Sequence, residues 1–147
     1  MKLLLASSNK HKAQEFKALL PLDIEILLPE ELGISFQCEE DKETFMENSI
    51  LKAKALYNAE LEALGEEKAI PVIADDSGLI VDALPGQLGV RTARYGSPDG
   101  VTILPAHQKN QLLLKAMGNI PFEKRGAKFV CSVTGIITPY KMYAGQE

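Results

Sequence analysis

The stretch LLLASSNKHKAQEFKALL, residues 3–20, determines the beginning of the fold. Its first four residues, Leu3 to Ala6, form an unbroken apolar run that stops at a polar turn, which is typical of a buried strand. From Lys10 to Leu20 apolar residues recur at spacings of three and four, so this segment is predicted to be a helix that Pro21 ends. The stretch therefore predicts a strand, a polar loop and a helix in succession.

Strand and helix patterns continue to alternate farther along the chain. Thr44 and Glu47 have the spacing of a capping box, so a long helix is predicted to begin there and to end near Gly65. The other predicted elements are strands at residues 23–28 and 129–133, a helix at residues 108–117, and a turn at Pro139 that leads to residues 141–143. This order predicts an α/β fold with a mixed central sheet flanked by helices.

Two adjacent carboxylates interrupt the apolar segment IPVIADDSGLIV, residues 70–81. We expect a buried strand at residues 70–74 that breaks at Asp75-Asp76-Ser77-Gly78 and resumes at residues 79–81. Ionised carboxylates at a strand end lose hydration and repel each other unless a cation or strong donors compensate. A lone aspartate here would be better explained as a turn residue. The pair favours a functional site, and Mg²⁺ would compensate its charge.

The polar turn after the first strand has the composition of a phosphate-binding site. Its residues are Ser7, Ser8, Asn9, Lys10, His11 and Lys12. A helix N-terminus offers unpaired N–H groups and a positive dipole end to an anion. An ordinary N-capping turn followed by solvated lysines is the alternative. Lysines in the first turn of a helix oppose its dipole, and this favours a bound anion.

Two weaker candidates lie between these segments. The acidic run at residues 39–43 is most simply a solvated loop, but Glu39 or Glu40 could supply a second hard oxygen ligand. Lys52, two turns into the long predicted helix, could reach a phosphate or extend its ammonium to water. Its position alone favours the second interpretation.

Composition limits the class of protein. A chain of 147 residues, 46% of them apolar, is predicted to form one domain over residues 1–147. A net charge of −4 argues against a nucleic-acid partner, although a small anion remains an acceptable ligand. Cys38 and Cys131 are far apart, which predicts neither a zinc site nor a disulfide framework. We expect a cytoplasmic protein without membrane contact, because no apolar run has signal-peptide or membrane-spanning length.

Three segments taken together, LLLASSNKHKAQEF, ETFMENSILKAKA and IADDSGLIVDALPGQLGVRTARYG, resemble the inosine triphosphate pyrophosphatase family in order and spacing. The resemblance extends from Met1 to about Val133. It implies Mg²⁺-dependent hydrolysis of the deaminated purine nucleotides ITP, dITP and XTP at the α-phosphorus, which yields a monophosphate and pyrophosphate. It also implies a homodimer whose subunits have a cleft between two lobes.

The resemblance assigns roles to individual residues. Asp76 would be the catalytic carboxylate, which activates or positions water, and a metal ligand together with Glu39 or Glu40. The residues that would hold the substrate are Ser7, Ser8, Asn9, Lys10, His11 and Lys12 of the turn together with Lys52 and Ser77.

The sequence departs from the family in its last part. It contains neither a GFGYDP-type segment nor the Ser-His-Arg motif that reads the base in the family. We therefore expect a C-terminally truncated form with an incomplete second lobe, for which a catalytically impaired nucleotide-binding or dimerisation remnant is one alternative. The related septum-formation-type pyrophosphatases are another, but the Lys10-His11-Lys12 and ADDSG segments count against them.

Overall fold

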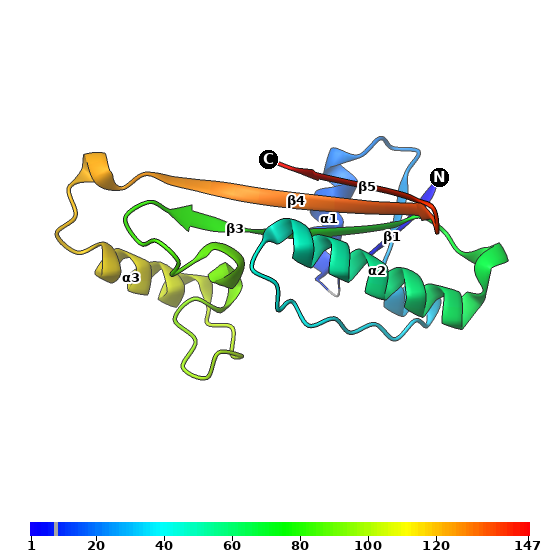
Figure 1. Cartoon of the computed structure of the whole chain (residues 1–147), viewed down its shortest axis with the longest axis horizontal. Coiled ribbons are helices and arrows are strands. Elements are labelled where there is room, and N and C mark those ends of the chain that lie inside the picture. The colour runs from blue at the N-terminus through cyan, green and yellow to red at the C-terminus, as the bar shows by residue number, and fades with distance from the viewer. Residues whose placement is uncertain (8) are drawn as a thin grey trace. The chain divides into compact units, whose positions relative to one another are not determined.

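The computed structural model describes residues 1–7 and 9–147, which form two compact units. Unit 1 comprises Met1–Asp76 and Ser132–Glu147, and unit 2 comprises Ser77–Cys131. The strands are β1 (Lys2–Leu5), β2 (Glu25–Leu27), β3 (Val72–Val81), β4 (Ala127–Thr138) and β5 (Lys141–Gln146). The α-helices are α1 (Lys10–Leu19), α2 (Phe45–Leu64) and α3 (Ala106–Met117), and short 3₁₀ turns include η1 (Pro29–Leu32) and η3 (Gly89–Arg94) (Figure 1).

The strands form one five-stranded sheet in the order β2-β1-β3-β4-β5. Strand β1 pairs in parallel with β2 and with β3, whereas β4 and β5 form an antiparallel hairpin. The predicted α/β fold with a mixed sheet is confirmed. The predicted strand at residues 129–133 is longer than expected, because β4 continues to Thr138 before the turn at Pro139.

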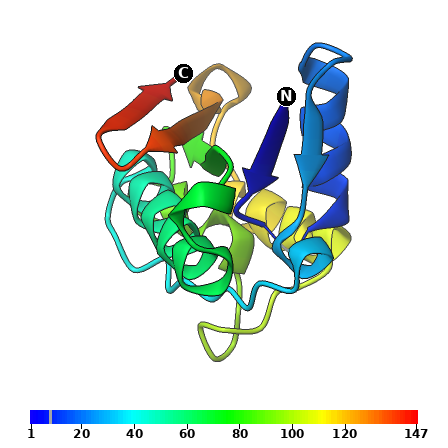
Figure 2. The ribbon, with the colours of Figure 1, turned by 90° about the vertical axis from the view of Figure 1, so that its right-hand side faces the viewer.

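Within unit 1, the two long helices α1 and α2 cover opposite faces of β1 and its neighbours (Figure 2). Side chains alternate between the faces of a strand, so consecutive apolar residues enter different cores. Leu4 and Val72 pack with Leu56 of α2, and Leu5 packs with Ala13 of α1. The unbroken apolar run of β1 therefore follows from its burial on both faces.

The ends of the helices follow the predicted capping signals. The Asn9 side chain accepts a hydrogen bond from the His11 N–H at the start of α1, with an N···O distance of 2.9 Å. Thr44 Oγ1 accepts from the Glu47 N–H at 3.1 Å, as expected of the capping box. Helix α2 ends at Gly65, whose φ of 79° lies in the left-handed region that favours glycine.

Strand β3 differs from its prediction. The expected break at residues 75–78 is absent, and β3 continues from Val72 to Val81. The prediction of a strand end was therefore wrong. A strand can carry two buried aspartates in its middle when donors meet both carboxylates, and such donors are present here.

Unit 2 has its own apolar cluster, formed by Val81, Leu84, Leu88 and Met117. The Thr92 hydroxyl in η3 accepts from the Leu79 N–H at 2.9 Å and so fixes this turn to β3. Across the part of the chain that the structure describes, no helix has the length and apolar character needed to cross a membrane.

Candidate functional site

The adjacent carboxylates of β3 lie on opposite faces of the sheet. Ile73 belongs to the apolar cluster under α1, and Ala74 belongs to the cluster under α2. The alternation continues with Asp75, whose carboxylate contacts α1, and with Asp76, whose carboxylate contacts α2. The repulsion that the sequence predicted is therefore reduced by geometry, and each carboxylate meets a different helix.

On the α1 face, Asp75 forms an ion pair with Lys12. Lys12 Nζ donates to Asp75 Oδ2 at 2.7 Å, and the Asp75 side chain is only 7% exposed. The other oxygen, Asp75 Oδ1, is buried and has no hydrogen-bond partner within the described residues. A buried carboxylate oxygen without a donor is costly, so a cation or a further donor at this atom would be stabilising.

On the α2 face, Asp76 meets an uncharged side chain. Asn48 Nδ2 donates to Asp76 Oδ2 at 3.0 Å, and both residues are buried. The other end of the Asn48 amide accepts from the Lys42 backbone N–H, also at 3.0 Å. The hydrogen bonds of Asn48 therefore join Asp76 to the acidic loop at residues 39–43.

Lys52, one turn after Asn48 on α2, also contacts this loop and β3. Its Nζ donates to the backbone carbonyl of Asp75 at 2.8 Å and lies 2.7 Å from Glu40 Oε1. The Lys52 side chain is 8% exposed, so the interpretation from position alone, an ammonium extended to water, was wrong. Two ammonium groups, from α1 and α2, therefore converge on Asp75.

The turn before α1 is held by its own side chains. Ser7 Oγ accepts from the Asn9 N–H at 3.0 Å, and Asn9 in turn caps α1. His11 is exposed, and Lys10 is exposed with its Nζ 3.9 Å from Glu30. Of the predicted turn residues, only Lys12 contacts Asp75 in the part of the chain described, and Ser8 lies outside the described residues.

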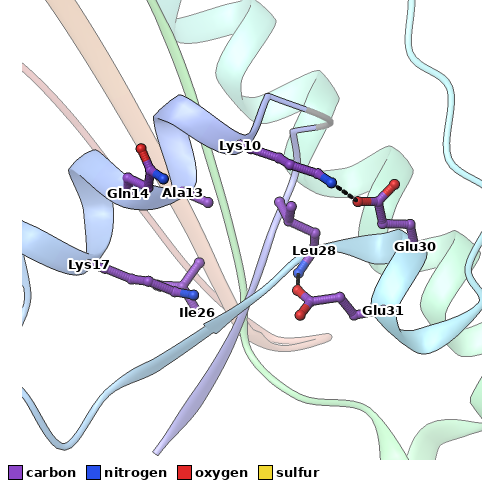
Figure 3. Close-up of a pocket in the computed structure, with 8 residues that line it drawn as sticks. All are labelled: Lys10, Ala13, Gln14, Lys17, Ile26, Leu28, Glu30 and Glu31. Carbon is purple, nitrogen blue, oxygen red and sulfur yellow. Dashed lines mark hydrogen bonds and ion pairs between the residues drawn. The ribbon is translucent and has the colours of Figure 1, made fainter.

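A pocket of about 280 Å³ lies beside this turn between α1, β2 and η1 (Figure 3). It is lined by Lys10, Ala13, Gln14, Lys17, Ile26, Leu28, Glu30 and Glu31. Lys10 and Glu30 approach each other at its rim, and the lining includes neither aspartate of β3. A smaller pocket of about 120 Å³ is lined by Ser7, Pro29, Glu30, Ile34 and Phe36. The groups suited to phosphate chemistry lie outside the larger pocket. They form a charged cluster that consists of Lys12, Lys52, Glu40, Asp75 and Asp76.

The predicted metal ligands are only partly assembled. Glu40 reaches the cluster through Lys52, whereas Glu39 and Ser77 are exposed. Among residues 1–7 and 9–147, no three His, Cys, Asp or Glu side chains are grouped closely enough to hold a metal ion. Mg²⁺ is commonly held by one or two carboxylates, with water and substrate phosphate completing its ligands. Asp76, with Glu40 attached to the same helix through Lys52, fits an ion bound in that way.

Sequence reasoning missed two contributors, the Lys12 contact to Asp75 and the amide of Asn48. Asn48 and Lys52 are four residues apart and therefore lie on the same face of α2. Both lie on the buried side of that helix. Polar residues at helical spacing on a buried stripe were the available signal, since such residues need partners.

The sequence profile of the Ham1 family matches residues 3–146. The chain is 41% identical over 147 residues to a dITP/XTP pyrophosphatase of Treponema denticola, covering all of this chain and 70% of the relative. It is 44% identical over 131 residues to a dITP/XTP pyrophosphatase of Treponema pallidum (strain Nichols), covering 89% of this chain and 44% of the relative. The chain thus spans between about half and about two thirds of the length of these relatives.

The fold is similar to that of the Staphylococcus aureus Ham1 protein, with a TM-score of 0.76 and 32% sequence identity. That alignment covers 99% of this chain and 68% of the solved chain. The family predicted from the three sequence motifs is confirmed by these similarities.

Proposed function

The chain belongs to the Ham1 family, and we propose that it hydrolyses deaminated purine nucleoside triphosphates such as dITP and XTP to the monophosphate and pyrophosphate. The names of its relatives support the substrate class. The observation that carries the proposal is the convergence of Lys12 and Lys52 on Asp75, with Asp76 as the next residue of the strand. Lysines and carboxylates in one cluster are the groups that phosphoryl chemistry requires.

The two lysines would hold the triphosphate. Each ammonium now contacts an oxygen of the protein, Asp75 in the case of Lys12 and Glu40 in the case of Lys52. A triphosphate offers more negative charge than one carboxylate, so it can compete for these ammonium groups. The Ser7–Asn9 turn at the N-terminus of α1 would contribute polar groups to the same anion.

Asp76 would hold Mg²⁺ together with Glu40 or Glu39, once the nucleotide has taken over the Lys52 contact to Glu40. When bound, the ion would neutralise charge on the phosphate oxygens. The hydrogen bond from Asn48 supports this role, because a neutral amide orients the Asp76 carboxylate without adding a positive charge.

The same carboxylate, Asp76, would orient the attacking water. The water oxygen forms a bond to the α-phosphorus while the bond from that phosphorus to the bridging oxygen breaks. Pyrophosphate leaves with the bonding electron pair, and the proton of the water passes to Asp76 and then to solvent. Lys12 and Lys52 would stabilise the charge that grows on the phosphate oxygens.

A homodimer is part of the proposal, and its only support is the family resemblance. Light scattering coupled to size-exclusion chromatography would test it. A mass near twice the 16.1 kDa of the chain would agree with a dimer, and a mass of one chain would contradict it.

Product analysis tests the proposed reaction. The purified chain, shown by circular dichroism to be folded, is incubated with dITP, XTP or ATP in Mg²⁺ or in EDTA. We expect dIMP and pyrophosphate from dITP, the corresponding products from XTP, little reaction with ATP, and none in EDTA. Release of dIDP and orthophosphate would contradict attack at the α-phosphorus. Binding of dITP by a folded chain without turnover would instead favour a nucleotide-binding protein that lacks this activity.

A further inference from the structure

We propose that Asn48 is a positioning residue that fixes the Asp76 carboxylate and holds the acidic loop, residues 39–43, beside it. The inference rests on the proposed function, since it assigns Asn48 a part in binding the metal ion. Asn48 itself would touch neither the substrate nor the ion.

The geometry of Asn48 uses both ends of its amide. The residue is 1% exposed, its Nδ2 donates to Asp76 Oδ2, and its Oδ1 accepts from the Lys42 N–H. Both bonds measure 3.0 Å. They also fix the orientation of the amide, because a flipped side chain would place acceptor against carboxylate and donor against N–H.

The chemistry of the amide matches its two neighbours. A carboxylate needs a donor and a backbone N–H needs an acceptor, and an amide provides both without a net charge. A lysine in this position would donate to Asp76 but would also neutralise it. An apolar residue would leave Asp76 and Lys42 without these hydrogen bonds in a buried site. Asn48 therefore orients Asp76 without adding a positive charge beside it.

The loop is held at a second point by the same helix. Lys52, four residues after Asn48, pairs with Glu40, so the first turns of α2 contact the acidic loop both at the Lys42 backbone and at the Glu40 carboxylate. This arrangement attaches the loop that carries Glu40 to the same helix that contacts Asp76. Loss of Asn48 would release one of the two attachments and would also remove the hydrogen bond that orients Asp76 Oδ2.

Ser49, the next residue, provides a matched control. It is 0% exposed, and its hydroxyl lies 2.8 Å from Thr134 Oγ1 and donates to the Met46 carbonyl at 2.9 Å. Ser49→Ala therefore removes buried hydrogen bonds from the same turn of α2 without touching Asp76. If the substitutions only destabilised α2, both variants would lose Mn²⁺ affinity. If Asn48 positions Asp76, only the Asn48 variant would lose it.

The test is Mn²⁺ binding, followed by electron paramagnetic resonance of the free ion, on the full chain and its Asn48→Leu and Ser49→Ala variants. Leucine has the same branched arrangement of heavy atoms as asparagine, with methyl groups in place of the amide oxygen and nitrogen, and removes both hydrogen bonds. We expect Asn48→Leu to weaken Mn²⁺ binding about 10- to 100-fold, as is usual when a residue supporting a metal ligand is lost. Ser49→Ala should stay within about twofold. Asn48→Ser, a smaller change, gives the same comparison if the leucine variant is unfolded by circular dichroism.

The same proteins are assayed for pyrophosphate release from dITP, which separates the two proposals. Unchanged Mn²⁺ affinity in both Asn48 variants would overturn the positioning role, and so would an equal loss in Ser49→Ala. If the parent chain binds Mn²⁺ but does not hydrolyse dITP, only the proposed function fails, and the Mn²⁺ affinities still decide the role of Asn48. A parent chain that binds no Mn²⁺ would overturn the inference together with the metal site.

Discussion

On the α1 face of the sheet the buried carboxylate of Asp75 meets the ammonium of Lys12, whereas on the α2 face the next carboxylate, Asp76, meets the neutral amide of Asn48. The ammonium of Lys12 offsets the negative charge of Asp75. The hydrogen bond from the Asn48 amide orients the Asp76 carboxylate without adding a positive charge. Two neighbouring residues of the same type therefore acquire different properties from the helices that cover them. We propose that an anion exchanges with Asp75 at Lys12 on the α1 face and that a cation binds Asp76 on the α2 face.

The largest expected effect comes from removing charge on the α2 face. Asp76→Asn keeps the size of the side chain and an acceptor for Asn48, so we expect a folded protein. Turnover of dITP should fall by at least about 100-fold, since the group that orients water and binds the ion is lost. The measurement is kcat from pyrophosphate release, with circular dichroism as the control for folding. Turnover equal to that of the parent chain would remove Asp76 from the mechanism.

The next largest effect comes from breaking the ion pair on the α1 face. Lys12→Met leaves the Asp75 carboxylate buried without its ammonium, so we expect a loss of about 2 kcal/mol in the free energy of unfolding. Urea denaturation measures this. Lys17→Met is the matched control, because Lys17 is exposed on the same helix and its loss should cost no more than about 0.5 kcal/mol. Equal losses in the two variants would mean that the Lys12–Asp75 ion pair contributes no more to the free energy of unfolding than an exposed lysine does.

A third buried carboxylate, Glu60 on α2, extends the comparison because, among the described residues, neither an ammonium nor an amide side chain contacts it. Its Oε1 accepts from the Ile70 N–H at 2.9 Å, its Oε2 has no hydrogen-bond partner within the described residues, and the side chain is 0% exposed. Burial raises the pKa of Glu60 above its ordinary value of 4.5, and the hydrogen bond from Ile70 opposes this only in part.

The raised pKa of Glu60 predicts how its contribution to stability depends on pH. The contribution is fully present below a pH of about 4.5, the pKa of the unfolded chain, and is lost as pH rises through the folded pKa. Glu60→Gln cannot ionise and supplies a donor where Oε2 now lies. We expect it to be more stable than the parent chain at pH 8 by about 1 kcal/mol, with a smaller difference at pH 5. Thermal unfolding at the two pH values measures this, and a difference that does not change with pH would show that folding does not shift the pKa of Glu60.

The smallest expected effect concerns the start of α2, which carries Asn48 and Lys52. Thr44→Ala removes the hydroxyl that accepts from the Glu47 N–H, so we expect a loss of about 1 kcal/mol in the free energy of unfolding. Turnover measured well below the melting temperature should change by less than about threefold, because the contacts to Asp76 and Glu40 lie farther along the helix. A larger drop would mean that the cap, and not only Asn48, sets the position of Asp76.

Local features were predictable because local sequence determines them. The apolar run at Leu3–Ala6, the capping box at Thr44 and the terminating Gly65 each depend on residues a few positions apart. The break predicted at Asp75-Asp76 was wrong for the opposite reason. Whether a strand tolerates buried carboxylates depends on donors from other elements, and Lys12 is 63 residues away from Asp75 in the sequence.

The candidate site shows the same division. The acidic pair and the lysines stand out by residue type, but the sequence does not reveal that Asp75 and Asp76 face different helices. The alternation of side chains along β3 assigns Asp75 and Asp76 to opposite faces only if the segment is one continuous strand. A break at these residues would have left their orientation undetermined. Asn48 was missed because its hydrogen-bond partners, Asp76 and the Lys42 backbone, are brought together by the fold.

The central claim is that Lys12, on the α1 face, binds phosphate and that Asp76, on the α2 face, binds the metal ion. It is tested most directly by calorimetric binding of an α,β-imido analogue of dITP, in Mg²⁺ and in EDTA, to the parent chain and to its Lys12→Met and Asp76→Asn variants. Lys12→Met should weaken binding about 10-fold in both buffers, because it removes a charged contact to phosphate. Asp76→Asn should remove only the additional affinity that Mg²⁺ confers. Identical behaviour of the two variants in the two buffers would contradict the division between the faces.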